Sequence, residues 1–401
     1  MHPQRIVYVD HCAAWSGGEI ALLRLLEPLV RAGRRPLVVL GEDGPLVAEL
    51  QRAGVEVRVL PLDPRTNRLD RAAAARVPLR SLLDVARYVV RLRRLLREER
   101  PDLVHTNSLK SGIYGSLAAR LAGVPVVWHV RDRIADDYLP GPLVRLVRLL
   151  LLLLPDAVLV NSEATRATLG GAVRRAVPHR VLVDPYRPAT PGTARTTLAF
   201  PPRVALVGRL APWKGQHLFL DAVDSLHATG VHVHAVLLGS ALFGEEEYAA
   251  ALAERVDRGN ALVELGSFDG DVSEALRDVD VVVNASVIPE PFGQVVVEAI
   301  ANGVPVVVPD TGGPAEIITD GVSGMTFTAG DPQDLAGVLA TLLGLPSLHR
   351  RLSANGLVRA RDFDPEVVAA DYESFVATVA RTGVLRRGRR ALGQASRSQA
   401  G

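Results

Sequence analysis

Short runs of valine, leucine and isoleucine alternate with longer amphipathic segments along almost the whole chain. Such runs are typical of strands that are buried on both faces of a parallel sheet. The segment 81–100 places leucine and valine on one helical side and arginine on the other. The alternation predicts βαβ units in a doubly wound α/β fold. The strands predicted in the first half are Arg5–Val9, Pro36–Leu40, Val55–Leu60, Leu103–Thr106, Val126–His129 and Ala157–Val160.

The alternation is interrupted at residues 185–202, which are rich in proline and threonine. We interpret this stretch as a linker, because it lacks periodicity and because 401 residues suffice for two domains. The first Rossmann-like domain is expected over 1–184 and the second over 203–364, with a cleft between them. The strands predicted in the second domain are Val204–Gly208, Val233–Leu238, Ala261–Glu264, Val281–Asn284 and Val306–Pro309.

The end of the chain is predicted to be helical and then disordered. Two helical stretches, Pro332–Leu343 and Pro346–Arg361, follow the last predicted strand. Asp364-Pro365 is a helix start signal, so a last helix is expected over 365–380. Residues 381–401 are rich in arginine, glycine and serine, and we expect a disordered basic tail there.

Composition narrows the class of function. Lysine and arginine number 46 against 44 aspartate and glutamate, and aromatic residues make up 4%, so nothing favours nucleic acid as a partner. The single cysteine, Cys12, excludes an internal disulfide. The apolar stretch Ile6–Val9 is too short for an export signal, and the run Leu149–Leu154 is far below the roughly 20 apolar residues that cross a bilayer. We therefore expect a cytoplasmic protein.

The segment Gly141–Leu154 leaves two interpretations open. It combines Arg145 and Arg148 with an almost wholly leucine face. It is either a buried helix or a helix that lies peripherally against anionic lipid at the inner face of the membrane.

Two loops that follow predicted strands have the composition of anion sites. Gly17 and Gly18 follow the first strand and open a helix, where backbone and helix N-terminus suit a phosphate, and a tight strand–helix turn is the alternative that this fragment alone favours. Arg209 and Lys214 lie in the loop after the first strand of the second domain, where doubly wound sheets bind ligands. A guanidinium and an ammonium together suit a diphosphate, and a solvated loop is the alternative.

The segment EPFGQVVVE carries two carboxylates around a helix start. Glu290 lies in the loop after a predicted strand, and Glu298 about five residues inside the next helix, roughly 7 Å along its axis. Carboxylates accept hydrogen bonds from vicinal hydroxyls, and the first turn of a helix leaves N–H groups for phosphate. A nucleotide sugar has hydroxyls at both ends and a diphosphate in the middle, so it meets both demands.

The segments GRLAPWKGQ, EPFGQVVVE and VPVVVPDTGGPAEII, in this order, resemble the C-terminal domain of retaining glycosyltransferases with the GT-B fold, family four. The loop SGGE and the segment VVWHVRD are similar to the first domain of that family. The resemblance covers the chain to about Ala380. It implies that the last helix crosses back onto the first domain.

The resemblance also implies roles for individual residues. Arg209 and Lys214 would bind the donor diphosphate and stabilise the leaving group, and Glu298 would bind the ribose hydroxyls. Glu290 would contact the donor sugar. The remaining implied contacts are His129 beside the reacting sugar, Gly17 and Gly18 near the phosphate, the main chain of Phe292, Gly293 and Gln294 near the sugar, and Ser267 with its neighbours Gly266 and Phe268 near the nucleobase.

The implied function is transfer of a sugar from a nucleotide-sugar donor to a glycan, lipid-linked or small-molecule acceptor, with retention of anomeric configuration. The family needs no divalent cation, and we expect no metal and no cofactor. The Asp-x-Asp triplets at Asp269/Asp271, Asp278/Asp280 and Asp362/Asp364 are interpreted as turns and caps rather than metal ligands. Two alternatives stay open: a nucleotide-sugar epimerase or hydrolase of the same fold, and a non-catalytic two-domain sugar-binding protein.

Overall fold

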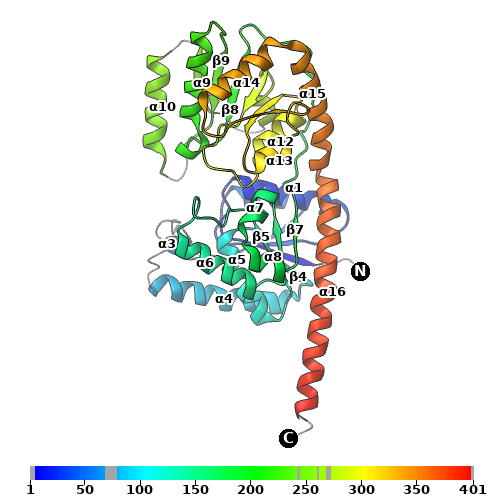
Figure 1. Ribbon diagram of the computed structural model, residues 1–401. Helices are drawn as coiled ribbons and strands as arrows, with labels where there is room; N and C mark the ends of the chain where they lie inside the picture. The colour runs from blue at the N-terminus through cyan, green and yellow to red at the C-terminus, as the bar shows by residue number, and fades with distance from the viewer. Residues whose placement is uncertain (1–4, 68–78, 242–243, 260–261, 268–271, 399–401) are drawn as a thin grey trace. The chain divides into compact units, whose positions relative to one another are not determined.

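The two halves of the chain form separate units in the computed structural model. Unit 1 consists of Met1–Pro185 and Pro365–Gly401, and unit 2 of Tyr186–Asp364. Each unit is a parallel sheet covered by helices (Figure 1), so the predicted doubly wound α/β architecture is confirmed. The structure describes residues 5–67, 79–241, 244–259, 262–267 and 272–398.

The described part of unit 1 has a seven-stranded sheet in the order β3-β2-β1-β4-β5-β6-β7, with all neighbours parallel. Its strands are β1 (Ile6–Asp10), β2 (Leu37–Leu40), β3 (Glu56–Val59), β4 (Leu103–Thr106), β5 (Val126–Val130), β6 (Ala157–Val160) and β7 (His179–Val181). Its helices are α1 (Gly17–Arg31), α2 (Pro45–Arg52), α3 (Pro64–Asn67), α4 (Leu79–Glu99), α5 (Leu109–Ala122), α6 (Gly141–Leu153), α7 (Glu163–Thr168), α8 (Gly171–Ala176) and α16 (Pro365–Ser398).

The described part of unit 2 has a six-stranded parallel sheet in the order β10-β9-β8-β11-β12-β13. Its strands are β8 (Arg203–Val207), β9 (His234–Leu238), β10 (Val263–Gly266), β11 (Val281–Val283), β12 (Val306–Pro309) and β13 (Met325–Phe327). Its helices are η2 (Pro212–Lys214), α9 (Gln216–Ala228), α10 (Glu246–Arg258), α11 (Val272–Ala275), α12 (Gln294–Ala301), α13 (Gly313–Ile317), α14 (Pro332–Gly344), α15 (Pro346–Ala360) and η3 (Arg361–Phe363).

The predicted strands lie within two residues of the observed ones at each end. The strands β7 and β13 were not predicted, because their sequences, HRV and MTF, are not continuous runs of valine, leucine or isoleucine. Residues 186–202, predicted as a linker, belong to unit 2. Arg195 N donates to Ser353 Oγ at 2.7 Å, and Ala199 N donates to Asp280 Oδ1 at 3.2 Å, so this stretch is anchored on the unit that follows it.

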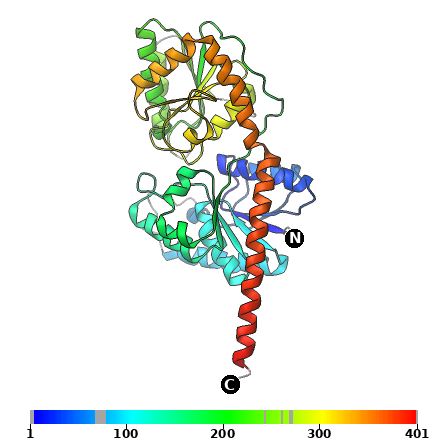
Figure 2. The same cartoon turned by 45° about the vertical axis from the view of Figure 1, so that its right-hand side comes forward.

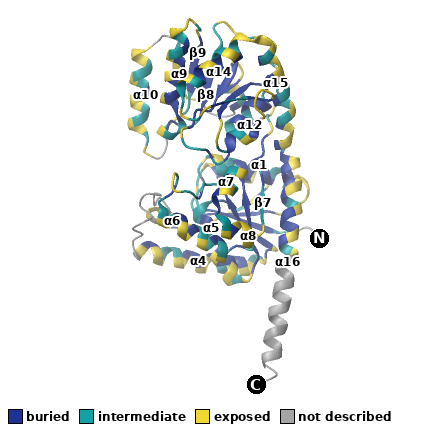
Figure 3. Cartoon of the chain, in the orientation of Figure 1, coloured by how far each residue is buried: buried dark blue, intermediate teal, exposed yellow. Residues whose placement is uncertain are grey.

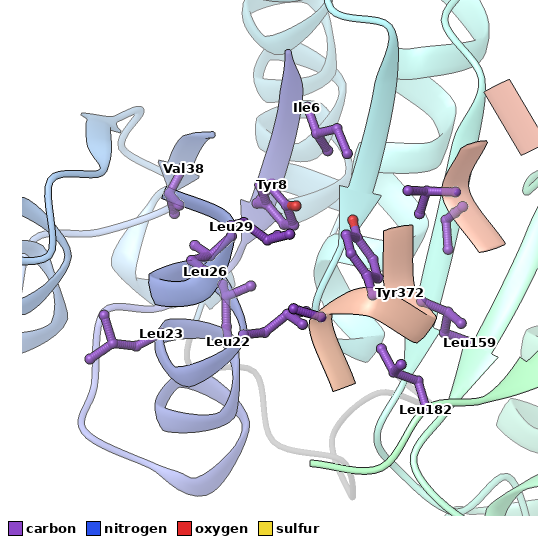
Figure 4. Close-up of a cluster of buried hydrophobic side chains, with 14 of the residues drawn as sticks. Ile6, Tyr8, Leu22, Leu23, Leu26, Leu29, Val38, Leu159, Leu182 and Tyr372 are labelled. Carbon is purple, nitrogen blue, oxygen red and sulfur yellow. The ribbon is translucent and has the colours of Figure 1, made fainter. Parts of the chain in front are cut away.

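The core of unit 1 lies on both faces of its sheet. On one face, α1 and α16 bury leucines and tyrosines against β1, β2 and β6 (Figure 4). On the other face, α4 and α5 pack on β1, β2 and β4, and α6 packs on β5 and β6. The helices α4, α5 and α6 therefore form one layer.

Helix α16 packs beside α1 although the whole of unit 2 precedes it in the sequence (Figure 2). Tyr372 is fully buried, and its hydroxyl lies 3.1 Å from Nδ1 of His105. Arg31 pairs with Glu366 at 2.9 Å at the rim of this contact. Apolar burial at Tyr372 and exposed ion pairs at the edges attach the helix to unit 1.

The expectation of a disordered tail from residue 381 is wrong, because α16 continues to Ser398. No proline follows Pro365, and the tail contains alanine, leucine and arginine, which are good helix formers. The composition that suggested disorder is therefore compatible with continuation of a helix that has already started.

Helix α5 packs closely on the sheet at Gly112. A Cβ atom added to Gly112 would lie 1.8 Å from Cε2 of Trp128, and Trp128 is completely buried. We expect Gly112→Ala to lower the free energy of unfolding by about 1–3 kcal/mol, because the helix or the indole must shift. Denaturation with guanidinium chloride, followed by circular dichroism, measures the change.

Gly337→Ala in α14 is the matched control. An added Cβ at Gly337 meets nothing within 4 Å, so this substitution should raise the free energy of unfolding by about 0.5–1 kcal/mol. Equal stability of the wild-type protein and Gly112→Ala would show that this packing is not close in solution.

Candidate functional site

The candidate site of unit 2 lies where the strand order of its sheet changes direction. From β8 the chain proceeds outward through β9 and β10, and β11 then begins on the other side of β8. The loops after β8 and β11 therefore leave neighbouring strands toward opposite faces, which is where open α/β sheets bind ligands. Arg209 and Lys214 lie in the first loop, and Glu290 lies in the second.

These two loops are joined by backbone contacts. Val287 N donates to the carbonyl of Trp213 at 2.9 Å. Gly313 N, which begins α13 after β12, donates to the carbonyl of Glu290 at 2.9 Å. The loops after the neighbouring strands β8, β11 and β12 are thus linked to one another at the carboxyl end of the sheet. These links fix the positions of the side chains that the loops carry.

Glu290 and Lys214 form an ion pair at the centre of the site. Nζ of Lys214 lies 2.7 Å from Oε1 of Glu290, and the Glu290 side chain is only 6% exposed. The same carboxylate accepts hydrogen bonds from Asn284 Nδ2 at 2.9 Å and from the hydroxyl of Ser286. Burial alone raises the pKa of Glu290, but the Lys214 charge and these three donors outweigh burial and lower it. Glu290 is therefore an anion at neutral pH.

Arg209 is the second cation of the site and has its own carboxylate partner. Nη2 of Arg209 lies 3.4 Å from Oε1 of Glu245, which precedes α10. The guanidinium also lies 5.6 Å from the ring centroid of Trp213, and Nζ of Lys214 lies 4.5 Å from the same centroid. The indole of Trp213 therefore contacts both cations through cation–π interactions and holds them near each other.

Helix α12 starts at the same edge of the sheet. Gly293 caps it with φ of 104°, and a Cβ there would lie 2.8 Å from Cγ of Pro314, so only glycine fits this position. Gln294 is the first residue of α12, and Glu298, about one turn further along the helix, is half-buried. Phe292, which precedes the cap residue Gly293, is buried. The predicted start of this helix near Gly293 is confirmed.

Ser267 is not brought to this group of loops by the sheet order. It is exposed and directly follows β10, which β9 separates from β8. The neighbouring Phe268, and Asp269 and Asp271 of the first Asp-x-Asp triplet, lie outside the described residues. A nucleobase contact at Ser267 stays a prediction.

In unit 1 the strand order changes direction between β1 and β4, and a polar network lies there. Asn107 donates from Nδ2 to Asp10 at 2.6 Å and to the carbonyl of Gly18 at 3.1 Å. Its Oδ1 accepts from Nε of Arg131 at 2.9 Å, and Arg131 forms a buried ion pair with Asp184. Asn107 thus holds the Gly17–Gly18 loop at the start of α1.

His129 lies in the interior of unit 1. It is 1% exposed, its ring packs edge-on against His105 at 5.3 Å, and in the described structure neither ring nitrogen has a hydrogen-bond partner. Burial, with a smaller effect of Arg131, lowers the pKa of His129 well below its usual value, and burial lowers that of His105 to about 3. Both imidazoles are neutral at physiological pH. The predicted contact of His129 with a sugar stays a prediction.

One group of side chains in the described structure has the spacing of metal ligands. Asp10, His11, Cys12 and Glu19 each place one donor atom within 4.8 Å of the others. They already bond to one another: His11 Nδ1 lies 3.1 Å from Asp10, and the Cys12 thiol and the Ser16 hydroxyl donate to Glu19. Burial raises the pKa of the Cys12 thiol, so it is not a thiolate. We assign no metal to this cluster.

The two described Asp-x-Asp triplets have structural roles at their second aspartates. Asp280 accepts from Arg203 N at 2.8 Å, and Asp364 pairs with Arg187 at 2.7 Å. Both bonds join distant parts of the chain, and the interpretation of the triplets as turns and caps stays a prediction.

Sequence reasoning missed Asn284, Ser286, Trp213 and Glu245. Asn284 and Ser286 directly follow β11, so the rule that led to Glu290 also indicates them. Trp213 lies between Arg209 and Lys214 in the sequence, and only the structure shows that its indole contacts both cations. Glu245 is one of three consecutive glutamates and shows no pattern of its own.

Replacing Lys214 by methionine would leave the carboxylate of Glu290 buried without its cation. We expect the pKa of Glu290 to rise in this variant, because the Lys214 charge is the strongest influence that lowers it. A lowered native pKa stabilises the fold above the unfolded pKa, and that stabilisation is lost as the pH falls. The free energy of unfolding of Lys214→Met should therefore be about 3 kcal/mol below that of the wild type near neutral pH, and this deficit should shrink as the pH falls. Chemical denaturation across pH measures this deficit.

The double variant Lys214→Met/Glu290→Gln is the control for that experiment. The double variant and Glu290→Gln both lack the titrating carboxyl group, so the deficit of the double variant relative to Glu290→Gln should not depend on pH. A deficit in Lys214→Met that does not change with pH would contradict the described role of the ion pair.

Comparisons with known proteins agree on one family. Residues 199–359 match the family model of glycosyl transferases group 1, and residues 16–187 match that of the glycosyl transferase 4-like domain. The chain is 28% identical over 307 residues to D-inositol 3-phosphate glycosyltransferase of Segniliparus rotundus, covering 71% of this chain and 68% of that protein. It is 29% identical over 332 residues to GDP-mannose-dependent alpha-mannosyltransferase of Mycobacterium tuberculosis, covering 79% and 81%.

Solved structures give the same result for the fold. Anabaena HepE in complex with UDP and glucose has a TM-score of 0.79 and 25% identity, covering 94% of this chain and 100% of that chain. Sucrose-phosphate synthase of Thermosynechococcus elongatus has a TM-score of 0.71 at 20% identity, covering 94% and 100%.

Proposed function

We propose a donor site on unit 2 of this chain, which belongs to the group 1 glycosyltransferases of the GT-B fold and therefore transfers a sugar from a nucleotide-sugar donor. The observation that carries the proposal is the arrangement of Arg209, Lys214 and Glu290 around Trp213 at the point where the sheet order changes. Two cations and one buried carboxylate meet there, as binding of a diphosphate and a sugar requires.

In the proposed chemistry, the charged side chains lie where charge develops on the donor during the reaction. Breaking the bond between sugar and phosphate leaves positive charge on the sugar ring and adds negative charge to the departing diphosphate. Arg209 and Lys214 stabilise that negative charge, and because Trp213 and Glu290 already hold them in place, little reorganisation is needed. Glu290 accepts hydrogen bonds from the donor sugar, and Glu298 from the ribose. Retention of anomeric configuration belongs to the proposal, and no nucleophile is assigned.

Metal independence is also part of the proposal. A divalent cation in such a reaction neutralises the diphosphate, and here Arg209 and Lys214 supply two positive charges for that task. The acceptor is proposed to be a glycan, a lipid-linked sugar or a small molecule, consistent with the inositol phosphate and mannosyl transfer named for the relatives. The family and the relatives give no support to an epimerase, a hydrolase or a non-catalytic sugar-binding protein.

We further propose a cytoplasmic enzyme with peripheral contact to the inner face of the membrane. The single Cys12 supports a reducing compartment, and exposed leucines on α6 support the contact. In the part of the chain that the structure describes, no helix combines the length and the hydropathy that a membrane span requires.

Release of nucleoside diphosphate tests the donor site. We expect purified protein to release the nucleoside diphosphate from one of a panel of UDP- and GDP-hexoses, at the same rate with and without EDTA. Arg209→Ala and Lys214→Ala should each lower kcat about 100-fold to 1000-fold, because each removes a charge that stabilises the leaving group.

Arg258→Ala is the control, because among the described residues Arg258 makes only an exposed ion pair with Glu254 on α10 of the same unit. It should keep the wild-type rate. Wild-type rates in Arg209→Ala and Lys214→Ala, with folding shown by circular dichroism, would exclude the proposed site.

The ion pair between Arg209 and Glu245 predicts an effect on donor affinity. The donor diphosphate must compete with Glu245 for the guanidinium, and Oε2 of Glu245 is buried without a hydrogen-bond partner among the described residues. Glu245→Gln removes the competing charge, so the KM for the donor should fall about fivefold, which corresponds to roughly 1 kcal/mol. Glu247→Gln, on the exposed first turn of α10, should leave KM unchanged. A KM that rises in Glu245→Gln would mean that Glu245 assists binding instead.

A further inference from the structure

Helices α5 and α6 of unit 1 carry leucines that point to solvent. Leu146, Leu149 and Leu153 on α6 are 47%, 50% and 56% exposed, and Leu117 and Leu121 on α5 are 40% and 51% exposed. We call these five residues the leucine face. Figure 3 shows exposed positions on both helices in yellow. Clustered exposed leucines mark interaction sites, whereas single ones are ordinary.

The leucine face is additional to the packing of α6 on its own sheet. Val144, Val147 and Leu151 are buried and attach the helix to β5 and β6. Leu146, Leu149 and Leu153 recur on the opposite side, so α6 has apolar side chains on two opposite sides. In the part of the chain that the structure describes, the inner side is covered by β5 and β6, and the leucines of the outer side are exposed.

The two helices are joined at their C-terminal ends. Nε of Arg120, on the last turn of α5, donates to the carbonyl of Leu154, which ends α6, at 2.6 Å. This bond joins the C-terminal ends of the two helices. Leu121 follows Arg120 in the sequence and Leu153 precedes Leu154, so both leucines lie at these joined ends. Both helices belong to the layer that also contains α4.

The layer of α4, α5 and α6 has more basic than acidic residues. Helix α4 has six arginines against three acidic residues, while α5 and α6 each have two basic residues and no acidic one. The chain as a whole has a formal charge of only +2, so the excess is local. Arg145 on α6 and Arg97 on α4 are exposed, and Nε of Arg93 on α4 donates to the carbonyl of Leu121 at 3.1 Å. Basic residues therefore border the leucines.

We propose that the leucine face is the surface by which this protein binds an anionic lipid bilayer. Leucines enter the boundary between headgroups and acyl chains, and the bordering arginines contact lipid phosphates. A second copy of this chain fits less well, because two such faces would bring like charges together. The inference rests on the proposed peripheral contact and is independent of the donor site on unit 2.

Vesicle flotation of the full chain tests the proposal. The vesicles are phosphatidylcholine alone, or phosphatidylcholine mixed with phosphatidylglycerol, at low and high salt. Wild-type protein should bind the anionic vesicles at least about tenfold more tightly than the neutral ones, and less tightly at high salt. Leu146→Glu/Leu149→Glu should lower binding to anionic vesicles by about tenfold or more, and Arg145→Glu by about fivefold.

The matched control is Leu345→Glu/Val358→Glu on unit 2. These two side chains are 50% and 59% exposed, so the substitutions add the same charge at equally exposed apolar positions outside the leucine face. The control should bind vesicles like wild type. Circular dichroism and the rate of diphosphate release should be unchanged in Leu146→Glu/Leu149→Glu, which separates lost lipid binding from unfolding.

Three results would overturn the proposal. Wild-type protein that does not float with anionic vesicles excludes it, and so does equal binding by wild type and Leu146→Glu/Leu149→Glu. Self-association in analytical ultracentrifugation that the double variant abolishes, without vesicle binding by wild type, would assign the face to a second copy instead. Lack of diphosphate release would count against the donor site alone, because flotation is measured without donor.

Discussion

The ion pair between Lys214 and Glu290 determines how the candidate site of unit 2 is built. A buried carboxylate is unfavourable unless its charge is balanced and its oxygens are hydrogen-bonded. Here one ammonium and the side chains of Asn284 and Ser286 meet that requirement at Oε1 of Glu290. Because these partners come from the loops after β8 and β11, satisfying one carboxylate also joins the two loops. The positions of Trp213, and through it of Arg209, depend on that junction.

Both units use the change of strand order for polar chemistry, but they balance charge differently. In unit 2, two cations gather around one indole, and each is paired with a glutamate from another loop. In unit 1, Asn107 connects the carboxylate of Asp10 to the guanidinium of Arg131, and the Gly18 carbonyl joins the same network. The first arrangement can exchange a carboxylate for a phosphate. In unit 1, the hydrogen bonds of Asn107 are made to Asp10, Gly18 and Arg131 of the same unit, and they position the loop at the start of α1.

Much of this organisation was predictable from residue patterns. The long apolar runs predicted the strands of both sheets, and the rule that ligands bind beyond the carboxyl ends of parallel strands led to Arg209, Lys214 and Glu290. The disordered tail was wrongly predicted, since composition does not indicate whether a helix that has already started will stop. The packing of His129 against His105 was not predicted, because the local sequence of a histidine near the end of a strand does not indicate which side chain its ring contacts.

The sequence alone determined the fold class, the order of the elements and the residue types available at the ends of the strands, because each follows from periodicity and from neighbours along the chain. Only the tertiary structure decided which charges meet. Glu245 and Arg209, or Glu290 and Lys214, are 36 and 76 positions apart. Such pairs form when sheet order brings separate loops together. The leucine face also follows from tertiary structure, since only packing shows which apolar side of α6 is left exposed.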